Sequence, residues 1–413
     1  GRPRSCLYEE SIIPCYFSFD PFGHHHHRHP ATHAMPPTTA PKPNSIWASS
    51  LVLWAGGGVA LLIVGALAGG LGYYFTRGGG SSSLSSSSNT TSTSPISPNT
   101  NTSITLDPRF SRSFWGINYT PLGAQLDMGC GVTQDNVIED LKILYQLTPR
   151  IRLYGMDCRQ AEFVLNGLKL LNVSMGVVLT IWVDPNSTTY QRQYDTFFSV
   201  IKTYGYDHLI GVSVGNEAIY RNDITVQNLT ARIADVRAKI TAAGYPEIPV
   251  YTTDNQKLDQ LIPAEDVLMD NVHPFFAGVT SQQAANWTWT YFWESDQSVA
   301  NQYGRPALIS ETGWPTFPAN ASQQAAVPSV ENLQVLLDTF ICQANMRNVP
   351  YFFFEFMDEP WKAIVFQALV ESYWGLFDQN RVLKNITLPQ CPLPVFVVGD
   401  VKIPQPTPLN MTG

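Results

Sequence analysis

Two glutamates in this 413-residue chain close apolar runs in which a carboxylate is unexpected. Glu217 ends the run "LIGVSVGNE", and Glu311 ends "ALISE" just before "TGWP". A charged group at the end of a buried strand costs free energy unless it has a partner or a task. One such glutamate is usually an ion-paired or solvated strand end, but two in matching positions favour a shared chemical role.

Paired carboxyl groups are what glycoside hydrolysis requires. One is held protonated and gives its proton to the leaving oxygen; in retaining enzymes the other attacks the anomeric carbon from about 5–5.5 Å away. We therefore expect Glu217 to act as acid/base and Glu311 as nucleophile, although the order of the two residues does not prove which does which. Asn216, beside the acid, is placed to hydrogen-bond a sugar 2-hydroxyl.

The elements that would hold these residues alternate along the chain. Near-continuous apolar strands begin at Phe114, Arg150, Met175, Leu209, Pro249, Met269, Ala307 and Pro350, and amphipathic helical patterns lie between most of them. This alternation indicates a parallel sheet covered by helices, and its span of about 280 residues suits a single α/β domain, the (β/α)8 TIM barrel. A doubly wound open sheet is the alternative, but its Gly-rich phosphate turn is missing from "TPLGAQLDMGCG" after the first strand. Catalytic groups of a barrel lie at the carboxyl ends of its strands, which brings both glutamates to one face.

Before the barrel the composition changes three times. Residues 1–45 are rich in Pro and His, and we expect a disordered cytosolic tail. Residues 46–76 hold a long uncharged apolar run, which predicts a single transmembrane helix acting as a type II signal anchor in the lipid bilayer. Residues 77–107 form a Ser/Thr-rich linker, residues 108–390 the barrel domain, and residues 391–413 a Pro-rich tail.

The expected topology places the barrel outside the cell. Basic residues are more frequent before the apolar run than directly after it, and every Asn-x-Ser/Thr sequon follows it. We therefore expect a single-pass protein of the plasma membrane whose catalytic domain is extracellular and faces the cell wall.

The cysteines and the overall charge limit the alternatives. Four cysteines follow the apolar run, and we expect two disulfides, Cys130–Cys158 and Cys342–Cys391, because the first pair follows neighbouring strands and the second ties the tail to the last long helix. No Cys/His spacing suggests a metal site. Charged residues make up 14% of the chain, aromatics 12%, and the net charge is −8 without a dense basic block, so no nucleic-acid partner is expected. We expect a monomer without metal or organic cofactor.

Three motifs, "VGNE", "SETGWP" and "MDEPWK…ESYWGLF", resemble the signatures of glycoside hydrolase family 17. The likeness spans roughly residues 110–390. It implies a (β/α)8 barrel, a retaining mechanism and an open cleft for β-1,3-glucan, with Glu217 as acid/base and Glu311 as nucleophile. The predicted membrane anchor and the Ser/Thr-rich linker resemble those of a fungal branch of the family.

The resemblance also assigns supporting residues. Tyr154 of "RLYG" would lie beneath the scissile bond. Glu359 and Lys362 keep the family's Glu-x-x-Lys spacing, and Glu371 precedes "SYWGLF"; these three are expected to bind substrate or to orient the nucleophile. The segment between Lys362 and Glu371 is longer than in plant members.

Aromatic side chains near the expected strand ends are candidates for stacking on sugars or for core packing. Among them Trp314, directly after the nucleophile motif, is the strongest candidate for substrate binding. His273 either reaches the cleft or is an ordinary hydrogen-bonded histidine. The candidate aromatic residues are Trp182, Tyr220, Phe275, Phe276, Trp314 and Trp361.

Taken together, the residues favour a retaining glycoside hydrolase acting on β-1,3-glucan of a cell wall. A β-1,3-glucan transglycosylase, in which a glucan hydroxyl replaces water, is the first alternative. A non-catalytic glucan-binding wall protein is the second, and the presence of both glutamates argues against it.

Overall fold

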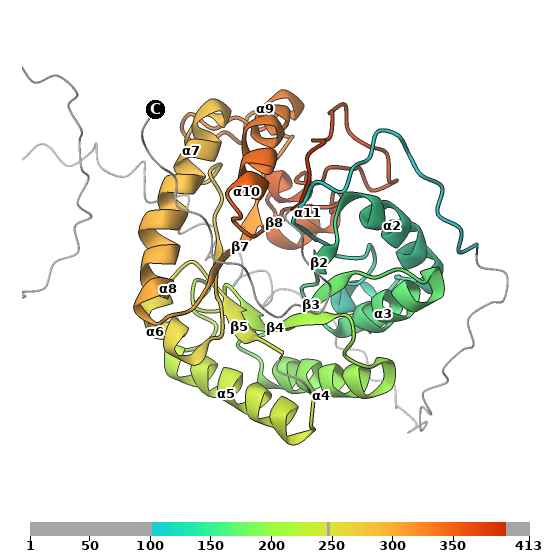
Figure 1. Ribbon diagram of the computed structural model, residues 1–413, viewed down its shortest axis with the longest axis vertical. Helices are drawn as coiled ribbons and strands as arrows, with labels where there is room; N and C mark the ends of the chain where they lie inside the picture. Colours follow the sequence, from blue (N-terminus) through green and yellow to red (C-terminus); the bar gives the residue numbers. More distant parts are fainter. Residues whose placement is uncertain (1–100, 246–247, 394–413) are drawn as a thin grey trace, which may run out of the picture. The chain divides into compact units, whose positions relative to one another are not determined.

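A computed structural model describes residues 101–245 and 248–393. Their centre is a ring of eight parallel strands with helices outside it (Figure 1), in the order β5-β4-β3-β2-β1-β8-β7-β6. This arrangement agrees with the expected (β/α)8 barrel. The strands are β1 (Gly116–Asn118), β2 (Arg150–Arg152), β3 (Gly176–Ile181), β4 (Leu209–Asn216), β5 (Val250–Thr253), β6 (Leu268–Asn271), β7 (Ala307–Thr312) and β8 (Tyr351–Phe353).

The helices follow the strands in sequence and cover the outside of the barrel. The α-helices are α2 (Gln134–Leu147), α3 (Gln160–Leu171), α4 (Ser187–Tyr204), α5 (Val226–Ala242), α6 (Leu258–Leu261), α7 (Ser281–Tyr291), α8 (Ser298–Gln302), α9 (Val330–Leu336), α10 (Cys342–Met346) and α11 (Trp361–Phe366). Short 3-10 or π segments are η1 (Leu126–Met128), η2 (Asp157–Arg159), η3 (Ile262–Ala264), η4 (Phe292–Gln297), η5 (Leu337–Ile341) and η6 (Leu369–Ser372).

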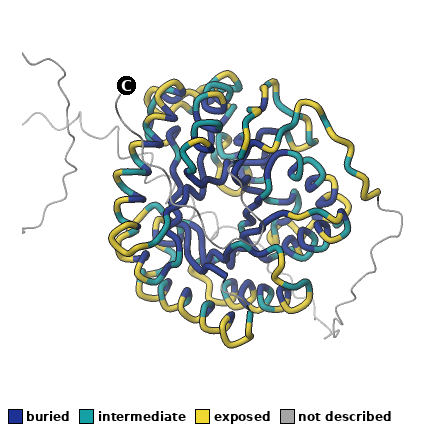
Figure 2. Tube along the Cα trace, viewed as in Figure 1, coloured by how far each residue is buried: buried dark blue, intermediate teal, exposed yellow. Residues whose placement is uncertain are grey.

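Helix α2 illustrates how the local sequence builds this outer layer. The Thr133 hydroxyl caps its first turn by accepting from Asn136 N at 3.2 Å. Val137, Leu141 and Leu144 recur at helical spacing and are buried, so one face of the helix packs on the barrel. The same pattern of a buried inner face and an exposed outer face runs around the domain (Figure 2).

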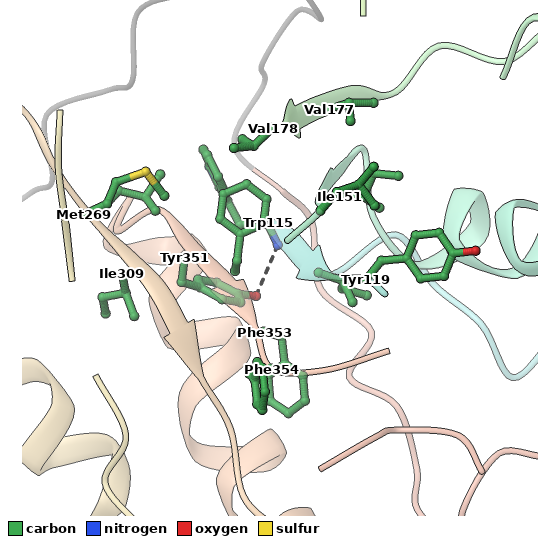
Figure 3. Packing of buried hydrophobic residues seen from close by; sticks show 14 of the residues in the cluster. Trp115, Tyr119, Ile151, Val177, Val178, Met269, Ile309, Tyr351, Phe353 and Phe354 are labelled. Atoms are coloured by element: carbon green, nitrogen blue, oxygen red, sulfur yellow. Dashed lines mark hydrogen bonds between the residues drawn. The ribbon is translucent and has the colours of Figure 1, made fainter. Parts of the chain in front are cut away.

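The strands are buried on both faces, as parallel strands under helices are. Figure 3 shows part of the packing between them, where Trp115 N donates to Tyr351 Oη at 3.2 Å. The Trp115 ring meets Phe352 edge-on and carries the Arg150 guanidinium 4.3 Å from its centroid. The ring of strands nearly closes between β5 and β6, where Asp254 N donates to Met269 O at 3.3 Å.

Two disulfides join the cysteine pairs that the sequence predicts. Cys130–Cys158 links the loops after β1 and β2, and Cys342–Cys391 links α10 to the C-terminal segment. Cys391 N also donates to Ser113 Oγ at 2.9 Å, so the segment is fastened just before β1.

Some segments predicted from the sequence cannot be compared with the structure. The predicted cytosolic tail and transmembrane helix (1–45 and 46–76), most of the 77–107 linker and most of the 391–413 tail lie outside them. Within residues 101–245 and 248–393, no helix has the length and apolar character needed to span a bilayer.

Candidate active site

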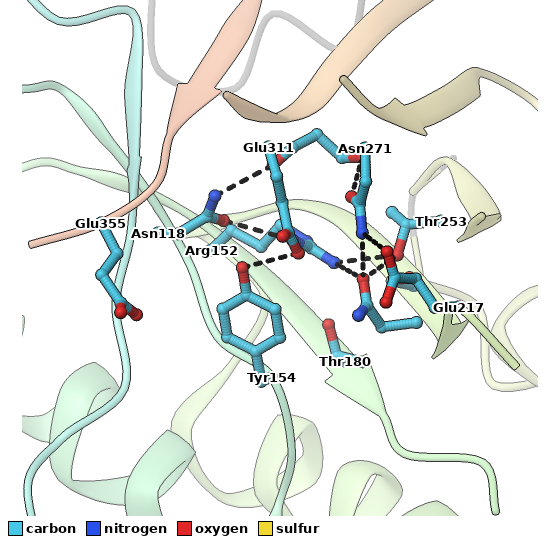
Figure 4. A network of polar contacts seen from close by, with 12 residues as sticks. Asn118, Arg152, Tyr154, Thr180, Glu217, Thr253, Asn271, Glu311 and Glu355 are labelled. Atoms are coloured by element: carbon cyan, nitrogen blue, oxygen red, sulfur yellow. Dashed lines mark hydrogen bonds and ion pairs between the residues drawn. The ribbon is translucent and has the colours of Figure 1, made fainter. Parts of the chain in front are cut away.

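The two glutamates lie at the same end of the barrel, because β4 and β7 are parallel strands that deliver them at their carboxyl ends. Glu217 directly follows β4 and has φ of 51°, in the left-handed region. Its backbone N donates to Thr253 O at 2.7 Å, which fastens it to the end of β5. Glu311 lies within β7 and is 5% exposed. Figure 4 shows both side chains in one polar network.

Arg152 of β2 is the centre of that network and is fully buried. Its Nη1 lies 3.0 Å from Glu311 Oε1. Its Nη2 donates to Asn216 Oδ1 at 2.7 Å and to Thr253 Oγ1 at 2.8 Å. One guanidinium therefore orients Glu311 and the residue next to Glu217 at once, since its donors diverge in a rigid plane.

Glu311 is surrounded by donors. Tyr154 Oη donates to its Oε1 at 2.8 Å, and His273 Nε2 lies 3.2 Å from its Oε2. A carboxylate only accepts hydrogen bonds, so this contact assigns a proton to Nε2 of His273. Burial raises the pKa of Glu311, but the His273 hydrogen bond and the positive charge of Arg152 outweigh burial and lower the pKa to about 2.

Glu217 has the opposite electrostatic surroundings. Burial raises its pKa, and the nearby negative charge of Glu311 raises it further. Asn271 Nδ2 donates to Glu217 Oε1 at 3.0 Å and only partly offsets the rise in pKa. The Asn271 amide is itself held by Ser310, whose hydroxyl donates to Asn271 Oδ1 at 2.6 Å.

A second cluster of charged side chains lies at the carboxyl end of β8, beside the Arg152 network. Lys362 Nζ lies 3.1 Å from Glu355 Oε1 and 2.9 Å from Glu359 Oε2. Burial and the charge of Glu359 raise the pKa of Glu355 well above its usual value. Burial likewise raises the pKa of Glu371, while the charge of Lys362 lowers it. Among the described residues, no group of three or more His, Cys, Asp or Glu side chains is arranged to hold a metal ion.

Trp314 does not lie where the sequence suggested. Its ring has no exposed surface, meets Phe275 edge-on, and donates from Nε1 to Val327 O at 2.9 Å. A ring enclosed in this way cannot stack on a sugar, so we correct the expectation for Trp314 and assign it to packing. The turn after β7 directs this side chain into the protein, a direction that strand-end position alone does not predict.

The other candidate aromatics divide between packing and surface. Phe275 is buried, whereas Tyr220 and Phe276 are each about half exposed, at 52% and 49%. Phe276 lies against His273, with ring centroids 5.8 Å apart, and is therefore next to the nucleophile candidate. The Trp182 ring is covered by the Arg221 guanidinium at 4.7 Å.

The surroundings move the pKa values of the two carboxyl groups in opposite directions. Donors and a cation lower the pKa of Glu311, while burial and its neighbour's charge raise the pKa of Glu217. Environments that push two carboxyl pKa values apart assign the acid and the nucleophile in glycoside hydrolysis.

A sequence model of the BtgE/BtgC glycoside hydrolase domain matches residues 116–375. The chain belongs to this family. A probable glucan endo-1,3-beta-glucosidase, btgC of Aspergillus flavus, is 37% identical over 309 residues, covering 69% of this chain and 45% of that protein. The chain thus spans about half the length of the curated relatives that it matches.

Solved structures support the same family. An active-site mutant of the Rhizomucor miehei beta-1,3-glucanosyltransferase, in complex with laminaritriose, is 29% identical with a TM-score of 0.59, over 67% of this chain and 98% of that chain. The crystal structure of a glycoside hydrolase family 17 beta-1,3-glucanosyltransferase from that organism is also 29% identical, with a TM-score of 0.57, over 66% of this chain and 96% of that one. The resemblance to glycoside hydrolase family 17 is therefore confirmed.

Sequence reasoning missed several residues of the BtgE/BtgC domain's candidate site. Arg152 and Glu355 are charged residues within apolar strand sequences, which is the signal that marked Glu217 and Glu311. Asn118 and Asn271 carry no such signal. They join the site because β1 and β6 neighbour β2 and β7 in the sheet, where Asn118 Oδ1 accepts from Arg152 Nη1 at 3.2 Å.

Proposed function

We propose that this domain is a retaining glycoside hydrolase that cleaves β-1,3-glucan, with Glu217 as acid/base and Glu311 as nucleophile. The observation that carries the proposal is the pair itself: buried Glu311 and partly buried Glu217 lie at one barrel end, joined through Arg152, Asn216 and Asn271, with pKa values displaced in opposite directions. The substrate class is supported by the relatives and neighbours named above.

In the first step, Glu311 attacks the anomeric carbon while Glu217 gives its proton to the leaving glycosidic oxygen. Arg152, Tyr154 and His273 keep Glu311 ionised and aim its oxygens. In the second step, Glu217, now a carboxylate, removes a proton from an acceptor O–H whose oxygen attacks the anomeric carbon, and the bond to Glu311 breaks to release its carboxylate. Asn216 Oδ1 accepts from Arg152 and Thr253, and among the described residues its amide NH2 has no acceptor, so it can donate toward a sugar hydroxyl.

The charged residues that follow β8 are also given roles in binding substrate. Lys362 is held between Glu355 and Glu359, and Glu371 lies near enough for Lys362 and Glu311 to influence its charge. We assign Glu371, which is partly exposed, to hydrogen bonds with sugar hydroxyls, and the buried Glu355 and Glu359 to holding Lys362 in place.

The acceptor in the second step defines a second candidate function, transglycosylation. The specific observation in its favour is that both solved structures above are described as glucanosyltransferases and are matched over nearly their whole length. Capture of the glycosyl-enzyme by a glucan hydroxyl instead of water requires no change in the roles of Glu217 and Glu311.

The topology is also a proposal: an anchor at residues 46–76 holds the domain outside the plasma membrane, facing the cell wall. Sequon asparagines in the described residues support it, because Asn118 alone is buried and the others are exposed. Removal of N-glycans should increase the electrophoretic mobility of protein made in a secretory host, and Asn118→Gln should leave that mobility unchanged. Protein without N-glycans would overturn the topology.

Incubation of the full chain with reduced β-1,3-gluco-oligosaccharides, followed by product sizing, tests the function. Shorter products alone mean hydrolysis, and longer products mean transfer. Glu217→Gln and Glu311→Gln should each lower turnover by about 10²–10⁴-fold or more while glucan binding persists. Glu331→Gln, exposed in the first turn of α9, serves as the matched control and should behave as wild type. Wild-type protein that binds glucan and releases no sugar would instead indicate a binding protein.

A further inference from the structure

The segment between α11 and η6 presents apolar side chains to solvent. Residues 363–370 read "AIVFQALV". Ile364 is 69% exposed, Val365 47%, and Phe366 and Leu369 43% each. We call these four residues the apolar lip. Contiguous exposed apolar groups are uncommon on soluble domains and mark binding surfaces more often than scattered ones do.

Both ends of the lip segment are anchored at the candidate active site. Lys362, at its start, is the buried residue of α11 and pairs with Glu355 and Glu359. Glu371, at its end, lies within the electrostatic reach of Lys362, His273 and Glu311. Because Ala363 N donates to Ser372 Oγ at 2.9 Å, the two ends also meet each other. The lip therefore stands on the rim of the same site and not on a remote face.

Side-chain packing also holds the apolar lip at the rim of the site. Phe366 lies against Trp361, with ring centroids 5.8 Å apart and planes tilted by 52°. The backbone then turns at Gln367, whose φ of 52° is left-handed, before η6 begins. The Phe366 ring is thus supported on one side and open on the other, which limits the conformational entropy lost when a ligand covers it.

We propose that the apolar lip binds glucose units of a β-1,3-glucan chain that lie beyond the units flanking the cleaved bond. This inference rests on the proposed function and adds a specificity for chain length. Glucose rings present neutral C–H faces, and residues 363–370 contain no charged side chain. Burying such faces against Ile, Val and Phe removes apolar surface from water on both partners.

The charge pattern favours glucan over a membrane as the occupant. Surfaces that lie on membranes combine apolar residues with Lys and Arg on the flanking polar face. The cation next to the lip, Lys362, is buried and neutralised by two carboxylates, so it cannot serve anionic lipid headgroups. Because the apolar lip adjoins the site that contains Glu217 and Glu311, the glucan substrate is the ligand that fits it.

The test compares Ile364→Ser/Phe366→Ser with a matched control, Leu106→Ser/Met346→Ser. The control residues are 74% and 78% exposed and lie before β1 and at the end of α10, away from the strands' carboxyl ends. For each full-length variant, kcat/KM is measured with β-1,3-linked gluco-oligosaccharides from the trisaccharide to the heptasaccharide. The affinity of the same protein for the tri- and heptasaccharide is measured by titration calorimetry.

We expect the lip variant to lose about tenfold in kcat/KM and in affinity for the heptasaccharide and less than about twofold for the trisaccharide, because only long chains reach the lip. The control should match wild type at every length. An equal loss at all lengths, or no loss, overturns the proposal. So does binding of wild type to anionic phosphatidylserine vesicles that the lip variant loses while its heptasaccharide affinity is unchanged.

The calorimetric measurement distinguishes failure of the proposed enzymatic function from failure of the proposed role of the apolar lip. If wild type turns over none of the oligosaccharides, the proposed enzymatic function fails. Affinity that rises with chain length only when the lip is intact would still support the lip, and affinity independent of the lip would overturn it.

Discussion

At the scale of single residues, protonation of two carboxyl groups governs the proposed chemistry. Glu311 must be ionised to attack, so activity falls as the pH drops through its pKa of about 2. Glu217 must be protonated to act as acid, so activity falls as the pH rises through its raised pKa. The pH profile of kcat/KM should therefore be bell-shaped, with Glu311 setting the acid limb and Glu217 the alkaline limb.

His273 provides a direct test of this assignment. The His273 hydrogen bond is the strongest influence that lowers the pKa of Glu311, so His273→Phe should raise this pKa and move the acid limb to higher pH. The measurement is kcat/KM against pH for wild type and variant. His208→Phe, at the amino end of β4, is the control and should keep the wild-type profile. An acid limb that stays at its wild-type pH in His273→Phe would refute the role of Glu311.

At the scale of elements, the loop after β4 depends on the end of β5. Asp254 is fully buried, and its Oδ2 accepts from Ile219 N at 2.7 Å while its Oδ1 accepts from Tyr220 N at 3.2 Å. These two amides begin two residues after Glu217, whose backbone is left-handed and is itself tied to the end of β5 through Thr253 O. Asp254 is therefore a positioning residue for the acid/base.

Asp254→Ala should lower kcat about tenfold or more with KM nearly unchanged, because Glu217 loses its alignment and the substrate contacts remain. The free energy of unfolding should fall by about 1–3 kcal/mol, since the amides of Ile219 and Tyr220, and those of Asn255 and Gln256, lose their acceptor. Asp254→Asn keeps one acceptor oxygen, so its kcat and its free energy of unfolding should lie between those of wild type and of Asp254→Ala. Kinetics identical to wild type in the alanine variant, measured on folded protein, would contradict the positioning role.

At the scale of the whole described domain, the Cys342–Cys391 bond secures the end of the chain. It closes a loop between residues 49 positions apart and holds the segment that packs at Ser113. Replacing both cysteines by serine should lower the free energy of unfolding by about 2–4 kcal/mol, as measured in denaturant. Activity per folded molecule should be retained, because α10 precedes β8 and lies away from the strands' carboxyl ends. Unchanged stability would show that the tail is fastened by other contacts.

The sequence was sufficient to predict the barrel and the position of Glu217 and Glu311 at one end of it, because each rests on a local signal. Apolar strands alternating with helices indicate parallel pairing, and a carboxylate that interrupts an apolar run marks Glu217 and Glu311. Arg152 and Glu355 interrupt apolar runs as well, but their relevance depends on which strands become neighbours. Asn271 and Asp254 are ordinary polar residues in sequence, and only the β5–β6 closure and the β4–β5 contact bring them to the acid/base.

The direction of a side chain after a strand was the main source of error. Trp314 and Phe276 both follow strands by a few residues, yet Trp314 is buried behind the site while Phe276 is half exposed beside His273. The turn geometry decides this direction, and the turn is fixed by contacts distant in sequence, such as the bond from Trp314 Nε1 to Val327 O.

The most direct test of the account is to trap the covalent intermediate with a 2-deoxy-2-fluoro β-1,3-glucobiosyl fluoride and locate it by peptide mass mapping of the full chain. A retaining nucleophile accumulates such an adduct because the 2-fluoro group slows both steps, whereas the good leaving group speeds only the formation of the glycosyl-enzyme. We expect one glycosyl group on Glu311, within the peptide that contains "SETGWP". An adduct on Glu217, Glu355 or another carboxylate, or turnover with inverted anomeric configuration and no adduct, would contradict it.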